Sequence, residues 1–181
     1  QEILEDIKTM ALADQQMRSS GSIDGDQDRR RTERVKSIFF RYGWPDRSVV
    51  GEEVVQAFWL LVQHADHDVS FQETALQALR DAVKHGEADP RDEAFLTDRV
   101  RVNRGYAQLF GTQCYINEQG IFGPRPIEDI DHLDERRACI GLEPFVIYLK
   151  RLEEWQIPIF TTGIPRLFRV FSFLSTRQSL V

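Results

Sequence analysis

The sequence predicts a mainly α-helical protein: one domain of about seven helices with a single small β-hairpin or irregular excursion near residues 106–126. Three observations lead to this prediction. Apolar residues recur at helical spacing along most of the 181 residues, glycine, proline and capping residues separate these stretches, and β-favouring alternation occurs in only one segment. A chain of this length with 41% hydrophobic residues can bury a core without disulfide bonds.

Two helices joined by a loop are predicted at the start of the chain. Residues 1–18 have apolar side chains every three or four positions, which is typical of an amphipathic helix. Residues 19–28 are rich in Ser, Gly and Asp, so we expect a mobile loop there. A second helix over residues 29–41 is expected to end before Gly43 and Pro45.

The middle of the chain contains the most apolar predicted helix, over residues 51–65, which we therefore place at the centre of the fold. The next helix is expected to begin at a capping box formed by Ser70 and Glu73. Another helix begins where Pro90 follows an N-cap aspartate. After the excursion, helical spacing returns over residues 131–139 and 144–155.

The last part of the chain differs in charge from the rest. Residues 157–181 contain three arginines and no acid, so their net charge is +3. Because the net charge of the whole chain is −6, residues 1–156 carry −6 − 3 = −9. We expect residues 1–156 to form the helical domain. Residues 157–181 are predicted to be a basic amphipathic tail that docks on this domain, contacts a partner or self-associates.

Composition also limits the classes of function. An acidic chain with a pI near 5.3 lacks the basic face that phosphate binding needs, so we expect no nucleic-acid partner. No stretch reaches the roughly 18 apolar residues of a membrane span. The first residues are acidic and lack the basic and apolar stretches of a signal peptide. The two cysteines do not form a CxxC pair, and a reducing compartment is expected. We therefore predict a cytoplasmic protein without a transmembrane segment.

The segment directly after the apolar helix has the residue types of an acid–base site: Gln63, His64, Asp66 and Asp68. A carboxylate beside His64 can fix the tautomer of the imidazole and raise its basicity, as a general base requires. His64 and Asp68, four residues apart, are also candidate ligands of a divalent metal, although two ligands do not complete a coordination sphere. The structural alternative is that the aspartates cap the next helix and His64 is a hydrogen-bonded core residue.

Two later clusters offer further polar side chains. Arg99 lies on a predicted helix, and Thr112 and Gln113 follow a glycine that permits a tight turn, so these three are candidate substrate-binding residues. Glu128 and Asp129 are adjacent acids, which suit acid–base chemistry and substrate binding. The alternative is structural for both clusters, because such side chains also satisfy backbone groups and cap helices.

These segments together resemble an uncharacterised, mainly bacterial domain-of-unknown-function family. The resemblance rests on QHAD at 63–66, DR at 98–99, GTQ at 111–113 and PIED at 126–129, and it extends over about residues 10–152. It implies that the polar segments belong to one fold, and it carries no activity. Further residues fit the same pattern: Asp14, Gln15 and Arg18, the Gly43-Trp44-Pro45 turn, Arg136, Arg137, Gly141, Leu142 and Tyr148.

We predict a small soluble enzyme that acts on a polar small molecule or modified peptide by hydrolysis, elimination or cyclisation. No cofactor is expected, because the sequence has no nucleotide, flavin or other cofactor motif. Two alternatives remain open: a non-catalytic helical binding module, and a hydrolase assisted by a divalent metal at His64 and Asp68. The predicted catalytic residues are His64, Asp66, Asp68 and Glu128, and the predicted substrate-binding residues are Gln63, Arg99, Thr112, Gln113 and Asp129.

Overall fold

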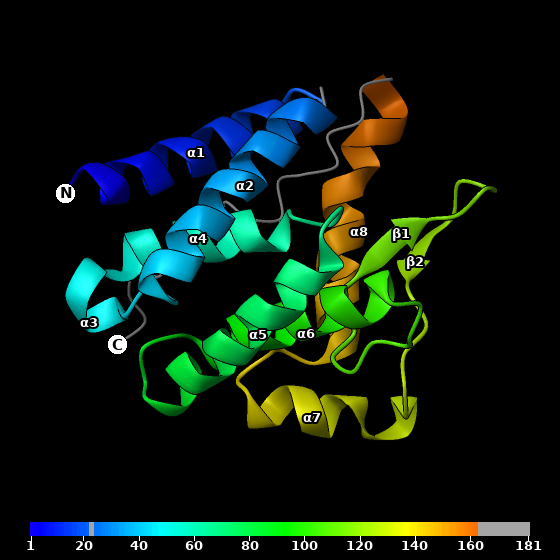
Figure 1. Cartoon of the computed structure of the whole chain (residues 1–181). Helices are drawn as coiled ribbons and strands as arrows, with labels where there is room; N and C mark the ends of the chain where they lie inside the picture. The colour runs from blue at the N-terminus through cyan, green and yellow to red at the C-terminus, as the bar shows by residue number, and fades with distance from the viewer. Residues whose placement is uncertain (22–23, 163–181) are drawn as a thin grey trace, which may run out of the picture.

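The computed structural model describes residues 1–21 and 24–162, and within them eight α-helices and one β-hairpin make up the fold (Figure 1). The mainly helical class predicted from the sequence is confirmed. The helices are α1 (Glu2–Ser19), α2 (Gly25–Tyr42), α3 (Arg47–Val50), α4 (Glu52–Gln63), α5 (Val69–Lys84), α6 (Pro90–Asn103), α7 (Leu133–Cys139) and α8 (Phe145–Thr162). The strands are β1 (Cys114–Ile116) and β2 (Phe122–Pro124), and a 3-10 turn, Ile130–His132, precedes α7.

Helix α4 lies at the centre, as its apolar sequence predicts. Eight of its 12 residues are buried, and it packs against α1, α2, α3, α5 and α6. A helix that is apolar on nearly every side has no face to present to water, so neighbours must cover it. Trp59, in the middle of α4, donates a hydrogen bond from its indole nitrogen to the Asp92 carbonyl at 3.0 Å, which ties α4 to α6.

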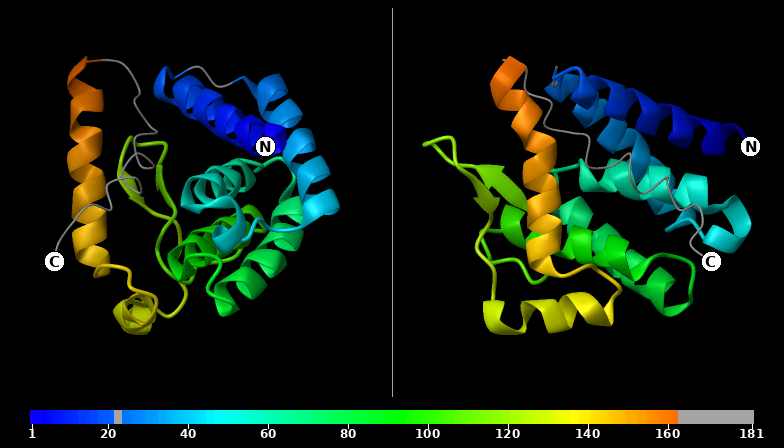
Figure 2. Two further views of the ribbon diagram at one scale, coloured as in Figure 1. Left: turned by 90° about the vertical axis from the view of Figure 1, so that its left-hand side faces the viewer. Right: turned by 180° about the vertical axis from the view of Figure 1, so that it is seen from behind.

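The remaining elements lie to one side of this core. Figure 1 and both views of Figure 2 show α8 beside the hairpin. Helix α8 packs against β2 and α7. None of the helices in the described part of the chain combines the length and the apolar character needed to cross a bilayer.

The predicted excursion contains an antiparallel hairpin in which Cys114 pairs with Pro124 and Ile116 with Phe122. Its turn is closed by the side chain of Asn117, whose oxygen accepts hydrogen bonds from the backbone N–H groups of Gln119 and Ile121 at 3.0 and 2.8 Å. Asparagine is favoured at such turns because its side chain replaces a backbone acceptor.

Two local predictions were wrong, and the same residue type explains both. Helix α2 begins at Gly25, inside the loop predicted over 19–28, because the Asp24 carboxylate accepts hydrogen bonds from two backbone N–H groups of the first turn. Helix α5 begins at Val69, because Asp68 rather than Ser70 is the N-cap residue. An aspartate in a polar stretch is equally compatible with a loop and with a cap, so the sequence pattern alone does not distinguish them.

The predicted boundary between domain and tail falls within a helix. Helix α8 continues past residue 156 to Thr162. The remainder of the predicted basic tail, including all three of its arginines, lies outside the described residues.

Gly111 provides a test of how tightly α8 packs on the loop before the hairpin. Its φ is +68°, and a Cβ there would lie 2.8 Å from the Phe145 ring. We expect Gly111→Ala to lower the free energy of unfolding by about 2–4 kcal/mol, because backbone strain and overpacking act together. Gly120→Ala is the matched control: its φ is +78° with nothing within 4 Å, so only the strain of about 1 kcal/mol applies. Equal losses in urea unfolding would contradict the tight packing.

Candidate functional site

The side chain of His64 belongs to a buried network that joins three helices. His64 is the residue at the C-terminal end of α4, and its Nδ1 lies 2.5 Å from Oδ2 of Asp14 on α1. Arg18, one turn after Asp14, places its Nε 3.1 Å from both oxygens of that carboxylate. His64 and Arg18 are each 7% exposed, and Asp14 is 1% exposed.

These distances determine the tautomer of His64. A contact of 2.5 Å between Nδ1 and a carboxylate oxygen requires a proton between them, and the imidazole supplies it. The Nε proton of Arg18 is then donated to Asp14, although His64 Nδ1 also lies only 2.9 Å away. We therefore assign His64 the Nδ1–H tautomer, in which Nε2 carries the lone pair.

The network extends to α2 and balances its charges. Asp28 accepts from Arg18 at 3.1 Å and from Arg31 at 2.6 Å, and Arg31 also lies 3.7 Å from Asp14. Two carboxylates thus face two guanidinium groups, and neutral His64 leaves the sum at zero. Buried charges are tolerated only when they are paired in this way.

The pKa values of the pair agree with this assignment. Burial lowers the pKa of His64 below its ordinary value, and the positive charges of Arg18 and Arg99 act in the same direction, against the raising effect of Asp14. For Asp14, burial raises the pKa, but the hydrogen bonds and charges of His64 and Arg18 outweigh it, so its pKa lies below the usual range. At neutral pH the pair therefore consists of a neutral imidazole and an ionised carboxylate.

Asp66 faces a different set of partners. Its carboxylate binds Arg99 at 2.8 Å and Asn103 at 2.9 Å, both on α6. The amide of Gln72 lies 3.3 Å from the same carboxylate and donates to the Val62 carbonyl at the end of α4. Asp66 thus holds Arg99 near the end of α4. From the sequence we expected Asp66 to orient His64, but its partners are Arg99, Asn103 and Gln72 instead.

Three buried polar groups near this end of α4 have no partner among the described residues. Both side-chain amide atoms of Gln63 lack a hydrogen bond, and Gln63 is fully buried. Nε2 of Gln15, which follows Asp14, and Nε of Arg99 are also buried atoms that lack a hydrogen-bond partner among these residues. Buried polar groups without partners are rare in proteins, because each costs about 1–3 kcal/mol. A polar ligand would supply the missing hydrogen bonds.

Asp68 is occupied by structural contacts. One of its oxygens accepts from the Phe71 backbone at 3.0 Å and caps α5, and the other binds Lys36 at 2.7 Å. Asp68 and His64 therefore have different hydrogen-bond partners in this structure. Across residues 1–21 and 24–162, no group of three or more His, Cys, Asp or Glu side chains is arranged to hold a metal ion.

Asp98 is the centre of a second network, which shapes the loop before the hairpin. This fully buried carboxylate accepts from the backbone N–H groups of Leu109, Phe110 and Thr112 and from the Thr112 hydroxyl at 2.7–3.1 Å. Burial raises the pKa of Asp98, and these hydrogen bonds act in the opposite direction. Because fixed N–H donors point at both oxygens, the ionised form is the one that the loop binds. Thr112 is thus part of the scaffold.

Further contacts hold the rest of this loop and the hairpin. The buried Gln108 side chain donates to the carbonyls of Gln113 and Arg125 and accepts from the Gln113 backbone. Arg137, 1% exposed, donates to the carbonyls of Phe110 and Glu143. Asp98, Gln108 and Arg137 therefore determine the path of the backbone.

Glu128 and Asp129 lie at the surface on the same scaffold. Glu128 pairs with Arg101, and Asp129, in the left-handed region with φ +46°, contacts His132 at 2.9 Å. Neither acid contacts His64, so the predicted complementary acid–base pair of His64 and Glu128 is not formed. The residues expected to line one cleft are divided among separate networks.

Comparison with known proteins agrees with the sequence resemblance. A model of the family of unknown function DUF6624 matches residues 5–157. The chain belongs to this family. Neither the curated proteins nor the solved structures give a significant match to the chain. Membership in DUF6624 therefore supplies no activity.

The carboxylate partner of His64 in this DUF6624 chain was missed at the sequence level, although a signal was present. The buried residues of α1 are Ile7, Ala11, Asp14 and Arg18, which lie along one stripe. The apolar stripe of α1 thus continues into a charged pair, and a charge on the buried face of a helix requires a buried partner.

The first test concerns the pH dependence of stability. Because the pKa of His64 is lowered on folding, the unfolded chain binds more protons below pH about 6.5, so stability is complete above that pH and declines as the pH falls. The decline from one proton is at most about 1.4 kcal/mol per pH unit. His64→Asn keeps an N–H donor for Asp14 but cannot titrate, so its urea unfolding free energy should fall less between pH 7 and 5.

The difference in stability between the wild type and His64→Asn isolates the contribution of His64. The raised pKa of His132 acts in the opposite direction, with stability lost as the pH rises, but it contributes equally to both proteins. The lowered pKa of Asp14 matters only below pH about 4. Parallel stability curves for the two proteins would contradict a buried neutral His64.

Asp98→Asn tests the loop network. An amide presents a donor to the backbone N–H groups of Leu109, Phe110 and Thr112, so we expect a loss of about 3–5 kcal/mol in the free energy of unfolding. Asp68→Asn serves as the control, because asparagine also caps helices and only the Lys36 ion pair is lost, about 1 kcal/mol or less. Similar losses in the two variants would contradict the proposed importance of Asp98.

Proposed function

We propose that this protein is a small acid–base enzyme in which His64 is the general base and Asp14 is the positioning residue. The single observation that carries the proposal is the buried contact of 2.5 Å between His64 and Asp14, supported by Arg18 on the same carboxylate. A neutral imidazole with a fixed tautomer and a lowered pKa is ready to accept a proton at neutral pH.

The chemistry follows from the charges of the network. When Nε2 of His64 takes a proton from a substrate or from water, the buried network changes from neutral to a net charge of +1. The adjacent Asp14 carboxylate stabilises the imidazolium that forms, and Arg18 keeps this carboxylate ionised and in place. Hydrolysis, elimination and cyclisation all begin with such a proton transfer, and none of them requires a redox cofactor.

Binding of the substrate is assigned to Gln63 and Arg99, as the sequence predicts. The Gln63 amide and Nε of Arg99 are buried and lack partners within the described residues, so a substrate with hydroxyl groups, which both donate and accept, would satisfy them. A polar small molecule or a modified peptide meets this requirement. Both cysteines, Cys114 and Cys139, are free thiols, which is consistent with the cytoplasmic location that we propose.

The alternative is a non-catalytic binding module. It is favoured by the low exposure of His64, 7%, and by the structural contacts that occupy Asp68, Asp98 and Glu128. In that case Gln63 and Arg99 would bind a ligand without turnover, and the buried network would only position α1, α2 and α4.

Turnover by paired variants tests the catalytic proposal. Mixtures of polar amides, esters, lactams and hydroxy acids are incubated with the full chain and followed by NMR. We expect His64→Asn to lower kcat by about 10²–10⁴-fold on any substrate turned over, because the general base is lost. Asp14→Asn should lower kcat to a similar extent and change the pH profile, because the tautomer is no longer fixed. Full activity of His64→Asn would refute the proposal.

A spectroscopic control separates loss of function from loss of fold. In ¹⁵N-histidine spectra, wild-type His64 should be in the Nδ1–H tautomer, and Asp14→Asn should lower its pKa further, because the charge that raises it is gone. Asp68→Asn should leave the His64 resonances in place. Ligand binding without any turnover, together with these spectra, would favour the binding module.

A further inference from the structure

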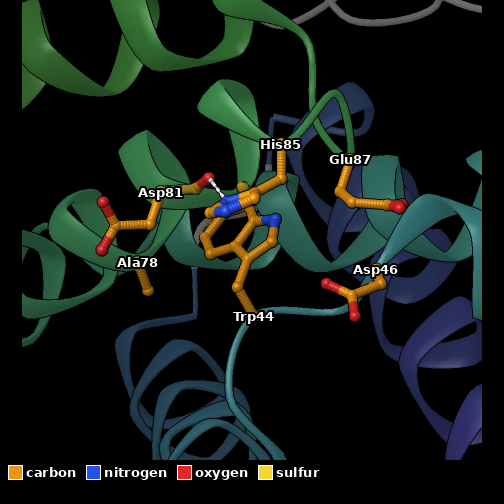
Figure 3. A pocket seen from close by; sticks show the side chains of 7 residues that line it. Trp44, Asp46, Ala78, Asp81, His85 and Glu87 are labelled. Carbon is orange, nitrogen blue, oxygen red and sulfur yellow. Dashed lines mark hydrogen bonds between the residues drawn. The ribbon is translucent and has the colours of Figure 1, made fainter.

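A pocket of about 490 Å³ lies where the turn after α2 meets the C-terminal end of α5 (Figure 3). Trp44, from the Gly43-Trp44-Pro45 turn, lines it together with small side chains of α5, Ala78 and Ala82. The pocket shares no lining residue with the His64 network. The polar lining residues are Asp46, Asp81, His85 and Glu87.

The lining of this pocket is acidic. It contains three carboxylates and neither lysine nor arginine. Glu87 is held ionised by the N–H and hydroxyl groups of Ser48 at 2.8 and 2.7 Å, and Asp81 pairs with Lys84, which lies outside the lining. Helix α5 also ends here at Lys84, and the carbonyl end of a helix carries partial negative charge. These groups together favour a positively charged ligand.

Trp44 supplies a second, independent observation. It is only 8% exposed, and its indole N–H has no hydrogen-bond partner in the described part of the chain. Figure 3 shows this nitrogen on the edge of the ring that is turned toward Asp46 and Glu87. The contrast with Trp59 is informative, because the N–H of that tryptophan donates to the Asp92 carbonyl. A buried indole N–H normally has an acceptor, so the ligand must bring one.

His85 adds an acceptor at the end of α5. Its Nδ1 lies 2.7 Å from the Asp81 carbonyl, which can only accept, so Nδ1 is the donor. In the neutral form of the ring Nε2 is then an acceptor. The pocket thus offers one buried donor, Trp44, and several acceptors around it.

We propose that this pocket binds a small primary amine that carries a carbonyl or hydroxyl oxygen close to its nitrogen. The ammonium group pairs with Asp46, which lies on the side toward which the Trp44 nitrogen is turned (Figure 3), and the oxygen accepts the hydrogen bond of the Trp44 indole. The indole ring also attracts a cation to its face. A carboxylate on the ligand would be repelled by the three acids, which limits the class to amino amides and amino alcohols.

The test uses glycinamide as the probe and the indole N–H resonances of the full chain as the readout. The chain has three tryptophans, and Trp44→Phe identifies the resonance of Trp44. We expect this resonance to shift in a saturable way as glycinamide is added up to about 50 mM, a range suited to so small a ligand. The resonances of the other two tryptophans should move far less.

Variants then separate the two parts of the recognition. Trp44→Phe keeps an aromatic ring and should weaken glycinamide binding about tenfold, because one hydrogen bond is lost. Asp46→Asn should weaken it to a similar extent, because one ionic contact is lost. Glu118→Gln makes the same charge change in the hairpin turn and should leave binding unchanged. Affinities of the variants are followed on the backbone N–H resonances of His85 and Glu87.

Two probes decide whether the chemistry is as proposed. Acetamide has the oxygen without the charge, and methylammonium has the charge without the oxygen, so both should bind more weakly than glycinamide. An equal response to acetamide, or no saturable shift with glycinamide, would overturn the proposal. An unchanged affinity of Asp46→Asn for glycinamide would overturn the proposed ionic contact. This result does not depend on whether Trp44→Phe folds.

Discussion

The buried carboxylate of Asp14 is the contact on which the arrangement of α1, α2 and α4 depends. It accepts from His64 and Arg18 and lies 3.7 Å from Arg31, so one side chain joins three helices. Without it, two guanidinium groups would remain buried beside a single carboxylate, Asp28, and such an imbalance costs several kcal/mol. The same carboxylate sets the tautomer of His64, which makes one contact responsible both for the packing and for the chemistry of the candidate site.

The polar segments of this chain have two different kinds of role. Asp98, Gln108 and Arg137 bind backbone groups of residues 108–113, a stretch with little regular structure of its own. Those backbone groups are buried and need partners, and the side chains provide them. The groups around Gln63 and Arg99 differ, because some of their own polar atoms lack partners among the described residues. The first kind builds the fold, and the second kind is what a ligand site requires.

The two proposed sites lie at different places and differ in charge. The network around His64 is neutral and pairs its carboxylates with guanidinium groups, so the ligand that we propose there would be recognised by hydrogen bonds. The pocket at Trp44 has acids without a lining lysine or arginine, so the ligand that we propose there would be recognised by its positive charge. The Gly43-Trp44-Pro45 turn, which ends α2, also places the indole that forms one wall of the pocket.

The sequence by itself determined the helical class and the central position of α4, because these depend on periodicity and on local caps and turns. It placed a hairpin or an irregular excursion near residues 106–126, and its polar segments indicated the family. It also singled out His64, Gln63 and Arg99. Only the tertiary structure decided that Asp14, rather than Asp66 or Asp68, is the partner of His64. Residues 14 and 64 meet through the packing of α1 on α4. The spacing in α1 shows that Asp14 lies on the buried face of the helix, but it does not show which residue Asp14 meets there. An aspartate near a histidine in sequence can equally cap the next helix, as Asp68 does.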